Sequence, residues 1–199
     1  MGEFVSTANI HSEIVITRRG QQTTVTVRGP ETHATVVSAP PEGEFLGITF
    51  NLGVFMPQLL PRVLKNQQDV VLPSHNSHTF CLDHSQWEIP TFDNVDVFIE
   101  RLINHKLLVC DPIISDVLRG HIPDLSVSAL QYRFTRATGF SQKLIEQIQR
   151  ADNAITLLQT GVSLADVAHE IGYYDQSHMT NAIKRFYGQT PSKFIKSNR

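Results

Sequence analysis

Apolar residues return every three or four positions through the last third of the chain. Between residues 141 and 160 this spacing predicts one continuous amphipathic helix that ends at Gly161. At 1.5 Å per residue, its roughly 18–20 residues would span about 27–30 Å. Glu146 and Arg150 are spaced for an i, i+4 ion pair on its surface. The inward positions are Leu144, Ile148, Ala151, Ile155 and Leu158.

Two shorter helices are expected after Gly161. Ser163 is placed to cap the first of them, with Asp166 three residues on, and Gly172 to end it. Asp175 then opens a second helix. The inward positions of this second helix are Met179, Ile183 and Phe186. Two amphipathic helices joined by a tight turn form a helix-turn-helix, although such pairs also occur in all-helical cores.

The outward face of the second helix favours DNA over a purely structural role. Amide and hydroxyl groups hydrogen-bond base edges in a major groove, and Lys and Arg contact phosphates. His178 either reaches DNA from the start of this helix or caps it locally. The polar face consists of Gln176, Ser177, Thr180, Asn181, Lys184 and Arg185.

A second pair of helices is predicted upstream. Asp111 and Pro112 form a helix start, and Gly120 ends that helix. Ser126 opens the next helix, whose inward positions are Val127, Leu130, Phe134 and Ala137. The connection from residue 120 to 125 is longer than the usual turn of about three or four residues. We therefore expect this pair to anchor the DNA backbone more than to read bases.

Several segments in this region resemble the C-terminal domain of AraC/XylS-type transcriptional regulators. They are Phe134-Thr-Arg-Ala-Thr-Gly-Phe140, Arg150-Ala151, Ser163-Leu-Ala-Asp-Val-Ala168, Ile171-Gly-Tyr-Tyr-Asp-Gln-Ser-His178 and Phe186-Tyr-Gly-Gln-Thr-Pro191. The resemblance covers roughly residues 94–199. It implies two helix-turn-helix units that are bridged by a long helix and enter adjacent major grooves.

The resemblance also implies roles for individual residues. Many relatives carry an arginine where this chain has Tyr132 or Asn181, which predicts an unusual target preference. The base-contacting residues would be Gln176, Ser177, Asn181, Ser128, Gln131 and Tyr132. Independently of the resemblance, the positive residues that flank the two exposed faces are expected to contact phosphates: Lys184, Arg185, Arg133 and Arg136.

The front of the chain is expected to be rich in β-structure. Two strands flank a hairpin turn at residues 18–21, and about four strands are expected within residues 13–53. A helix is expected from Asp93 or Asn94, with Phe98, Leu102 and Ile103 inward. Leu46, Ile48, Phe50 and Leu52 alternate along one strand and face either a ligand pocket or, as we prefer, the core.

These patterns predict an α+β fold in which a short β-rich region precedes an all-α domain. The boundary is placed between residues 90 and 91. Relatives often carry a ligand-binding or dimerising domain at this position, so residues 1–90 are interpreted as a reduced sensor, a dimerisation platform or a truncated domain. The expected partner is double-stranded DNA. A small-molecule effector, RNA polymerase and a second copy bound through the N-terminal region stay open.

Charge is distributed unevenly along the chain. The net charge is −2 over 199 residues, which by itself argues against a nucleic-acid-binding protein. Residues 126–199, however, carry nine Lys and Arg against five Asp and Glu, whereas residues 1–110 carry seven against eleven. An acidic front and a basic rear suit a sensor joined to a DNA-binding domain. The alternative is a ligand-sensing or partner-binding regulator whose helical part no longer reads DNA.

Other classes of function receive little support from the sequence. His75, His78, Cys81 and His84 are spaced every three residues, which on a helix would form pairs suited to zinc, but the alternative is a polar loop. Neither Cys81 nor Cys110 belongs to a CxxC motif, and no catalytic arrangement stands out, so no enzyme and no cofactor are expected. No apolar run is long enough for a membrane span, and we expect a cytoplasmic protein.

Overall fold

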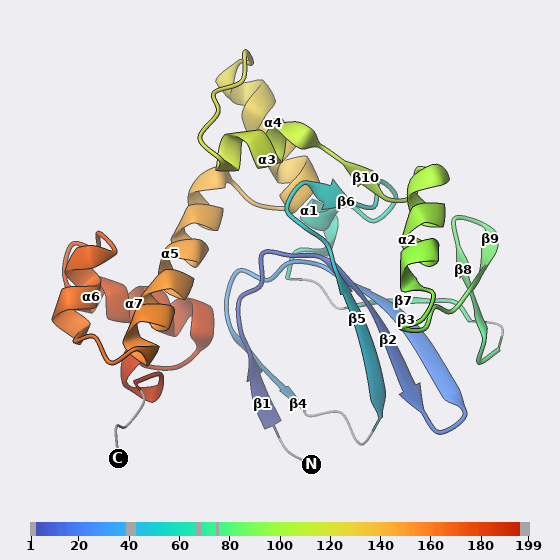
Figure 1. Ribbon diagram of the computed structural model, residues 1–199, viewed down its shortest axis with the longest axis horizontal. Coiled ribbons are helices and arrows are strands. Elements are labelled where there is room, and N and C mark those ends of the chain that lie inside the picture. Colours follow the sequence, from blue (N-terminus) through green and yellow to red (C-terminus); the bar gives the residue numbers. More distant parts are fainter. Residues whose placement is uncertain (1–2, 39–42, 67–68, 75, 196–199) are drawn as a thin grey trace. The chain divides into compact units, whose positions relative to one another are not determined.

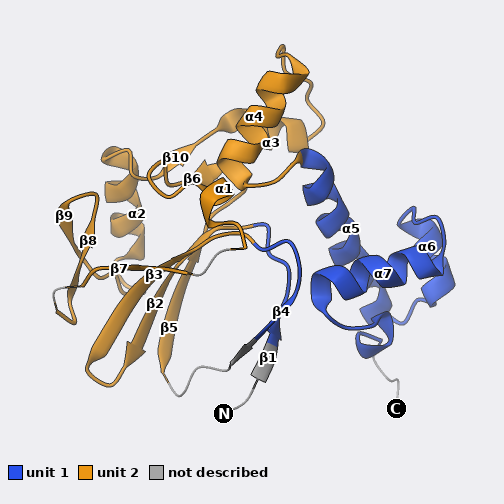
Figure 2. Cartoon of the chain, turned by 180° about the vertical axis from the view of Figure 1, so that it is seen from behind, with its two compact units in different colours: residues 1–10, 31–39, 142–199 blue, residues 11–30, 40–141 orange. Residues whose placement is uncertain are grey.

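The computed structural model describes residues 3–38, 43–66, 69–74 and 76–195. Strands dominate the front of the chain and helices the rear, as the predicted α+β class requires (Figure 1). Two compact units are present (Figure 2). Unit 1 comprises residues 1–10, 31–39 and 142–199, and unit 2 comprises residues 11–30 and 40–141. The boundary predicted between residues 90 and 91 falls inside unit 2, and it stays a prediction.

Unit 2 is built on a four-stranded antiparallel sheet of order β5-β2-β3-β7 (Figure 1). The predicted hairpin is confirmed, because Arg19 pairs with Gln22 across a two-residue turn. Gly20 occupies this turn with a φ of 56°, a value that glycine adopts without steric cost. The strands are β2 (Glu13–Arg19), β3 (Gln22–Arg28), β5 (Glu44–Thr49) and β7 (Val70–Leu72).

The core of unit 2 lies on one face of this sheet. The hairpin of β8 (Thr79–Leu82) and β9 (Ser85–Glu88) contributes to it together with helix α2 (Val95–Asn104). The ring centroids of Trp87 and Phe98 are 6.1 Å apart in an edge-on contact. Leu46 and Phe50 belong to the same core, as preferred above over a pocket.

One residue of α2 was assigned to the wrong face. Phe98 and Leu102 are buried as predicted, but the side chain of Ile103 is 53% exposed. Because successive helical residues are about 100° apart, a face centred on positions 98 and 102 turns position 103 away from the core.

The remainder of unit 2 connects the sheet to the first predicted helix pair. It contains β6 (Val54–Phe55), α1 (Pro61–Leu64), β10 (Val109–Cys110), α3 (Pro112–Leu118) and α4 (Val127–Thr138). Strand β10 pairs with β6 inside the region expected to be entirely helical. Residues 13–53, where about four strands were expected, contain four. The described residues form ten strands in all, because the other segments have only two to four residues and are too short to show a period.

Unit 1 combines the last helices with a ribbon from the front of the chain. The ribbon pairs β1 (Glu3–Ser6) with β4 (Thr35–Ser38). The helical part contains α5 (Gln142–Gln159), α6 (Leu164–Glu170), α7 (Gln176–Tyr187) and a 3₁₀ turn at Pro191–Lys193. Ala8 N donates to Phe186 O at 2.7 Å, and Ala34 N donates to Arg185 O at 3.2 Å. These bonds satisfy carbonyl groups that the end of α7 would otherwise leave without a helical partner.

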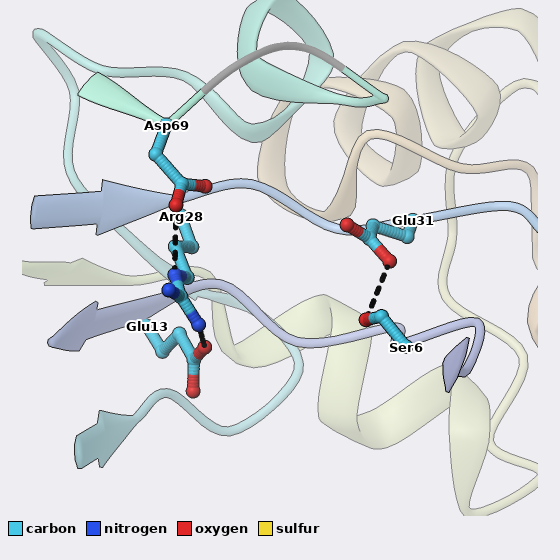
Figure 3. A network of polar contacts seen from close by, with 5 residues as sticks. All are labelled: Ser6, Glu13, Arg28, Glu31 and Asp69. Carbon is cyan, nitrogen blue, oxygen red and sulfur yellow. Dashed lines mark hydrogen bonds and ion pairs between the residues drawn. The ribbon is translucent and has the colours of Figure 1, made fainter. Parts of the chain in front are cut away.

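Ion pairs and polar contacts support each unit separately (Figure 3). In unit 2, Arg28 forms two ion pairs. Its Nε lies 2.9 Å from Asp69 Oδ2, and Arg28 Nη1 lies 3.6 Å from Glu13 Oε1. In unit 1, Ser6 Oγ donates to Glu31 Oε2 at 3.2 Å.

Within the described ranges, no helix combines the length and the apolar character that a bilayer crossing requires.

Candidate nucleic-acid interface

Helices α6 and α7 form the helix-turn-helix predicted at the end of the chain. Ser163 caps α6, since its Oγ accepts from Asp166 N at 3.2 Å. Asp175 caps α7, since its Oδ1 accepts from His178 N at 2.6 Å. Both predicted caps are therefore confirmed. His178 is thus held at the start of α7 through its backbone, and its side chain is exposed.

The turn between these helices has the geometry of a Schellman motif. Gly172 adopts a φ of 76°, as a left-handed C-terminal residue requires. Gly172 N donates to His169 O at 3.1 Å, and Tyr173 N donates to Ala168 O at 2.8 Å. This pattern turns the chain sharply into α7 and places the ring of Tyr173, which is 8% exposed, against the helices.

The inward faces of α6 and α7 pack with α5, which lies beside α7 in both views (Figures 1 and 2). Met179 and Ile183 are fully buried, and Phe186 is 2% exposed. Ala168 is also buried, as expected for a small side chain at a close helix crossing. On α5 the buried side chains are Ile145, Ile148, Ala151, Ala154, Ile155 and Leu158, so the predicted inward face is confirmed except for Leu144, which is half-buried.

The outward face of α7 is open to solvent. Thr180 is half-buried, and the other residues that the pattern placed there are exposed. The exposed residues of this face are Gln176, Ser177, Asn181, Lys184 and Arg185. Together their side chains carry two amide groups, one hydroxyl and two positive charges.

We expect the cap at Asp175 to stabilise this arrangement measurably. Asp175→Ala removes the acceptor for His178 N and should lower the free energy of unfolding by about 1 kcal/mol. The matched control is Thr190→Ala, because Thr190 precedes the 3₁₀ turn without a side-chain capping bond. Chemical denaturation of both variants checks this expectation. Equal losses in the two variants would contradict the assigned role of Asp175.

Helices α3 and α4 form the upstream pair. Asp111 Oδ1 accepts from Ile113 N, and Ser126 Oγ accepts from Ala129 N, each at 3.2 Å, so both predicted helix starts are confirmed. Ser128, Gln131 and Tyr132 are exposed on α4. The prediction that Val127 faces inward is wrong, because this side chain is 73% exposed. It lies in the first turn of α4, where the long connection from α3 leaves it uncovered.

The two arginines of α4 make contacts within unit 2. Arg133 binds Asp111 through both ends of its guanidinium, with Nε donating to Oδ2 at 2.9 Å and Nη2 donating to Oδ1 at 2.7 Å. The hydrogen bond to Asp111 raises the pKa of Arg133, so the guanidinium keeps its charge. Arg136 lies over the ring of Phe55, with Cζ 5.2 Å from the centroid. The phosphate contacts of both arginines stay predictions.

Glu146 and Arg150 were expected to form an ion pair, but among the described residues they do not. Glu146 Oε1 instead accepts from Gln142 Nε2 at 2.9 Å. Arg150 Cζ lies 5.8 Å from the centroid of the Tyr173 ring. Tyr173 closes the turn after α6, so Arg150 contacts this ring and not Glu146.

The sequence does not single out two tyrosines of unit 1, the buried Tyr173 and the half-buried Tyr187. The hydroxyl of Tyr187 donates to Asp152 of α5. The pKa of Tyr187 is raised, mainly because the side chain is partly buried and also because of this hydrogen bond. The hydroxyl of Tyr173 is buried without a hydrogen-bond partner in the described part of the chain. An aromatic residue directly after a helix-ending glycine, as at Gly172-Tyr173, is a usable sign of a packed C-terminal motif. The pairing of Tyr187 with Asp152, 35 residues away, has no local sign.

Of the residues considered for metal binding, Cys81 and His84 lie on the β8–β9 hairpin, and His78 lies just before it. His75 falls outside the described residues. His78 and His84 are exposed, and Cys81 is half-buried on β8. The helical pairing assumed for these positions is wrong, because β8 and β9 turn at Asp83 and His84 with φ values of 50° and 60°. Among the residues that the structure describes, no three His, Cys, Asp or Glu side chains gather as a metal site.

Comparison with known proteins adds to this geometry. Residues 123–197 match the family described as "Helix-turn-helix domain". The match therefore begins just before α4 and includes α5, α6 and α7, but not α3. The HTH-type transcriptional regulator RipA of Corynebacterium glutamicum is 33% identical over 91 residues, which are 45% of this chain and 28% of that protein. The chain thus matches well under two thirds of this relative's length, and no solved structure matches it.

Proposed function

Because residues 123–197 match a helix-turn-helix domain family and their motifs resemble those of AraC-type regulators, we propose that this chain regulates transcription by reading two adjacent major grooves of DNA. The observation that carries the proposal is the outward face of α7. It presents amides, a hydroxyl and positive charges on a helix capped at Asp175 and buried along its opposite side. Such a helix fits a major groove, where these groups meet base edges and phosphates.

The proposed contacts fall into two classes. The base-contacting residues are Gln176, Ser177 and Asn181 on α7, together with Ser128, Gln131 and Tyr132 on α4. The phosphate-contacting residues are Lys184 and Arg185 on α7, together with Arg133 and Arg136 on α4. All six base-contacting residues are exposed, which supports these assignments.

The N-terminal β-rich region is proposed to serve regulation rather than DNA reading. Its four-stranded sheet and core belong to unit 2, which does not contain α6 and α7, whereas its β1–β4 ribbon belongs to unit 1 with them. A small-molecule effector, RNA polymerase and a second copy of the chain are the partners to test there.

Selection from a random duplex library at near-physiological salt tests the proposed function. We expect an enriched, asymmetric motif with two half-sites about one helical turn, or roughly 34 Å, apart. A single short half-site would reduce the α3–α4 pair to a backbone anchor. Absence of enrichment by the folded protein would refute the proposal and favour a sensing or partner-binding regulator that does not read DNA.

Lys184 is expected to contribute affinity without sequence preference. Lys184→Ala removes one phosphate contact, so it should weaken cognate and random DNA alike and lower the slope of log K against log salt by about one. Binding titrations across a salt series check this. A loss confined to the cognate site would show that Lys184 contacts bases instead.

A further inference from the structure

A hollow on the surface of unit 1 lies between α5 and α7. Its volume is about 250 Å³, and Tyr173 and Phe186 contribute its aromatic walls. The polar side chains lining it are Gln147, Arg150, His178, Asn181 and Arg185. Among the described residues, those lining the hollow include two arginines and no Asp or Glu, so their formal charge is positive.

Two guanidinium groups enter this hollow from different helices. Arg150 belongs to α5 and Arg185 to α7, and both are exposed. In the part of the chain that the structure describes, the ion pairs involve Arg28 and Arg133, and neither Arg150 nor Arg185 belongs to one. On α5, Glu146 accepts from Gln142, and Asp152 accepts from the hydroxyl of Tyr187.

Aromatic rings hold both guanidinium groups without using their N–H donors. Arg150 Cζ lies 5.8 Å from the centroid of Tyr173, and Arg185 Cζ lies 5.1 Å from the centroid of Phe186. A cation above a ring face is attracted by the ring quadrupole and keeps its in-plane donors. Those donors match the oxygens of a phosphate or carboxylate in a bidentate manner.

The hydroxyl of Tyr173 adds a second, independent observation. The residue is 8% exposed, and its hydroxyl has no hydrogen-bond partner among the described residues. Most buried polar groups are paired, so an unpaired phenol in the wall of a positive hollow needs an explanation. An oxyanion held by the neighbouring arginines would supply an acceptor once the Tyr173 side chain shifts toward the hollow.

We propose that this hollow is an oxyanion-binding site in which Arg150 and Arg185 hold a phosphate or carboxylate group. The oxyanion has two possible sources. One is a backbone phosphate of bound DNA, in which case the site extends the proposed contacts of α7 to the long helix α5 and rests on the proposed function. The other is a free small anion. It would bind beside Asn181 and so change the surroundings of a residue that is proposed to read bases.

The first experiment uses the full chain without DNA. Inorganic phosphate is exchanged for chloride at constant ionic strength and pH, and the melting temperature is measured. If a free anion binds, the wild type should melt about 2–4 °C higher in phosphate. Arg150→Gln should lose this shift, and Tyr173→Phe should reduce it. The control Arg62→Gln changes the same charge on the exposed face of α1 and should keep the full shift.

The second experiment measures DNA affinity across a salt series for the same variants. If a DNA phosphate occupies the site, Arg150→Gln should lower the salt slope by about one on cognate and random duplexes, while Arg62→Gln leaves it unchanged. Arg150→Lys keeps the charge but not the planar fork, so it should retain most of the slope.

The two experiments separate this proposal from the proposed function. A phosphate-specific shift that depends on Arg150 supports a free-anion site even if the protein binds no DNA. A slope change that depends on Arg150, without a phosphate shift, supports the DNA source. If Arg150→Gln behaves like Arg62→Gln in both experiments, the oxyanion site is overturned, whether or not DNA binds.

Discussion

Asp111→Ala is expected to lower the free energy of unfolding by about 2–3 kcal/mol and the melting temperature by roughly 5–10 °C. Asp111 is 9% exposed and serves two partners, since it caps α3 at Ile113 N and binds both ends of the Arg133 guanidinium. Its removal deletes the cap and leaves Arg133 without its carboxylate. Because the Arg133 side chain is 38% exposed, water compensates part of this loss.

A matched control is available in the same unit. Asp69 also binds an arginine, Arg28, but the side chains of this pair are 45% and 47% exposed. Asp69→Ala should therefore cost less than about 1 kcal/mol. Asp111→Asn retains a capping oxygen and should fall between the two alanine variants. If Asp111→Ala and Asp69→Ala are equally stable, the Asp111–Arg133 contact contributes no more than a surface pair.

The same contact decides how Arg133 should be tested as a DNA residue. A guanidinium that joins α4 to the start of α3 positions the upstream helix pair, and it can reach phosphate only through its remaining donors. Arg133→Gln should therefore lose stability and DNA affinity together. A change in salt slope without a loss of stability would assign Arg133 to the phosphate backbone alone.

Asn181→Ala is expected to weaken the cognate site by about 1–3 kcal/mol, or roughly 5- to 150-fold, while leaving random DNA nearly unaffected. Asn181 is exposed on α7, and its amide can donate to and accept from an adenine edge in the major groove. Parallel titrations with the selected motif and a scrambled duplex measure the ratio of affinities, which is the quantity that carries specificity.

Gln189→Ala is the control for this prediction. Gln189 also offers an exposed amide, but it lies beyond the end of α7 and outside the proposed contacts. It should leave both affinities unchanged. Equal losses on cognate and scrambled DNA for Asn181→Ala would remove Asn181 from base reading and leave it as a lining residue of the α5–α7 hollow.

The helices of the rear half could be predicted closely from the sequence. The four caps at Asp111, Ser126, Ser163 and Asp175 all form the expected side-chain bonds. Each bond joins residues two or three positions apart, so its partners are brought together by the local backbone alone. The same locality explains the helix-ending glycines, such as Gly139 with its φ of 78°.

The short strands of the front half could not be predicted in this way. Strands β6 and β10 contain two residues each, and their partners are far apart in sequence. A period of two needs several alternations before it exceeds chance, and pairing between distant segments leaves no local pattern. The β-rich character was evident from composition, whereas the pairing depends on the assembled sheet.

By itself, the sequence determined the caps, the helix boundaries, the buried face of α7 and the polar face opposite, because neighbours within one or two turns decide all of these. Only the tertiary structure decided which partner each of several long polar side chains takes. Arg133 joins Asp111 across 22 residues, Tyr187 joins Asp152 across 35, and Arg150 prefers the ring of Tyr173 to Glu146. Such side chains have several partners of similar energy within reach, and the surfaces that folding brings together select among them.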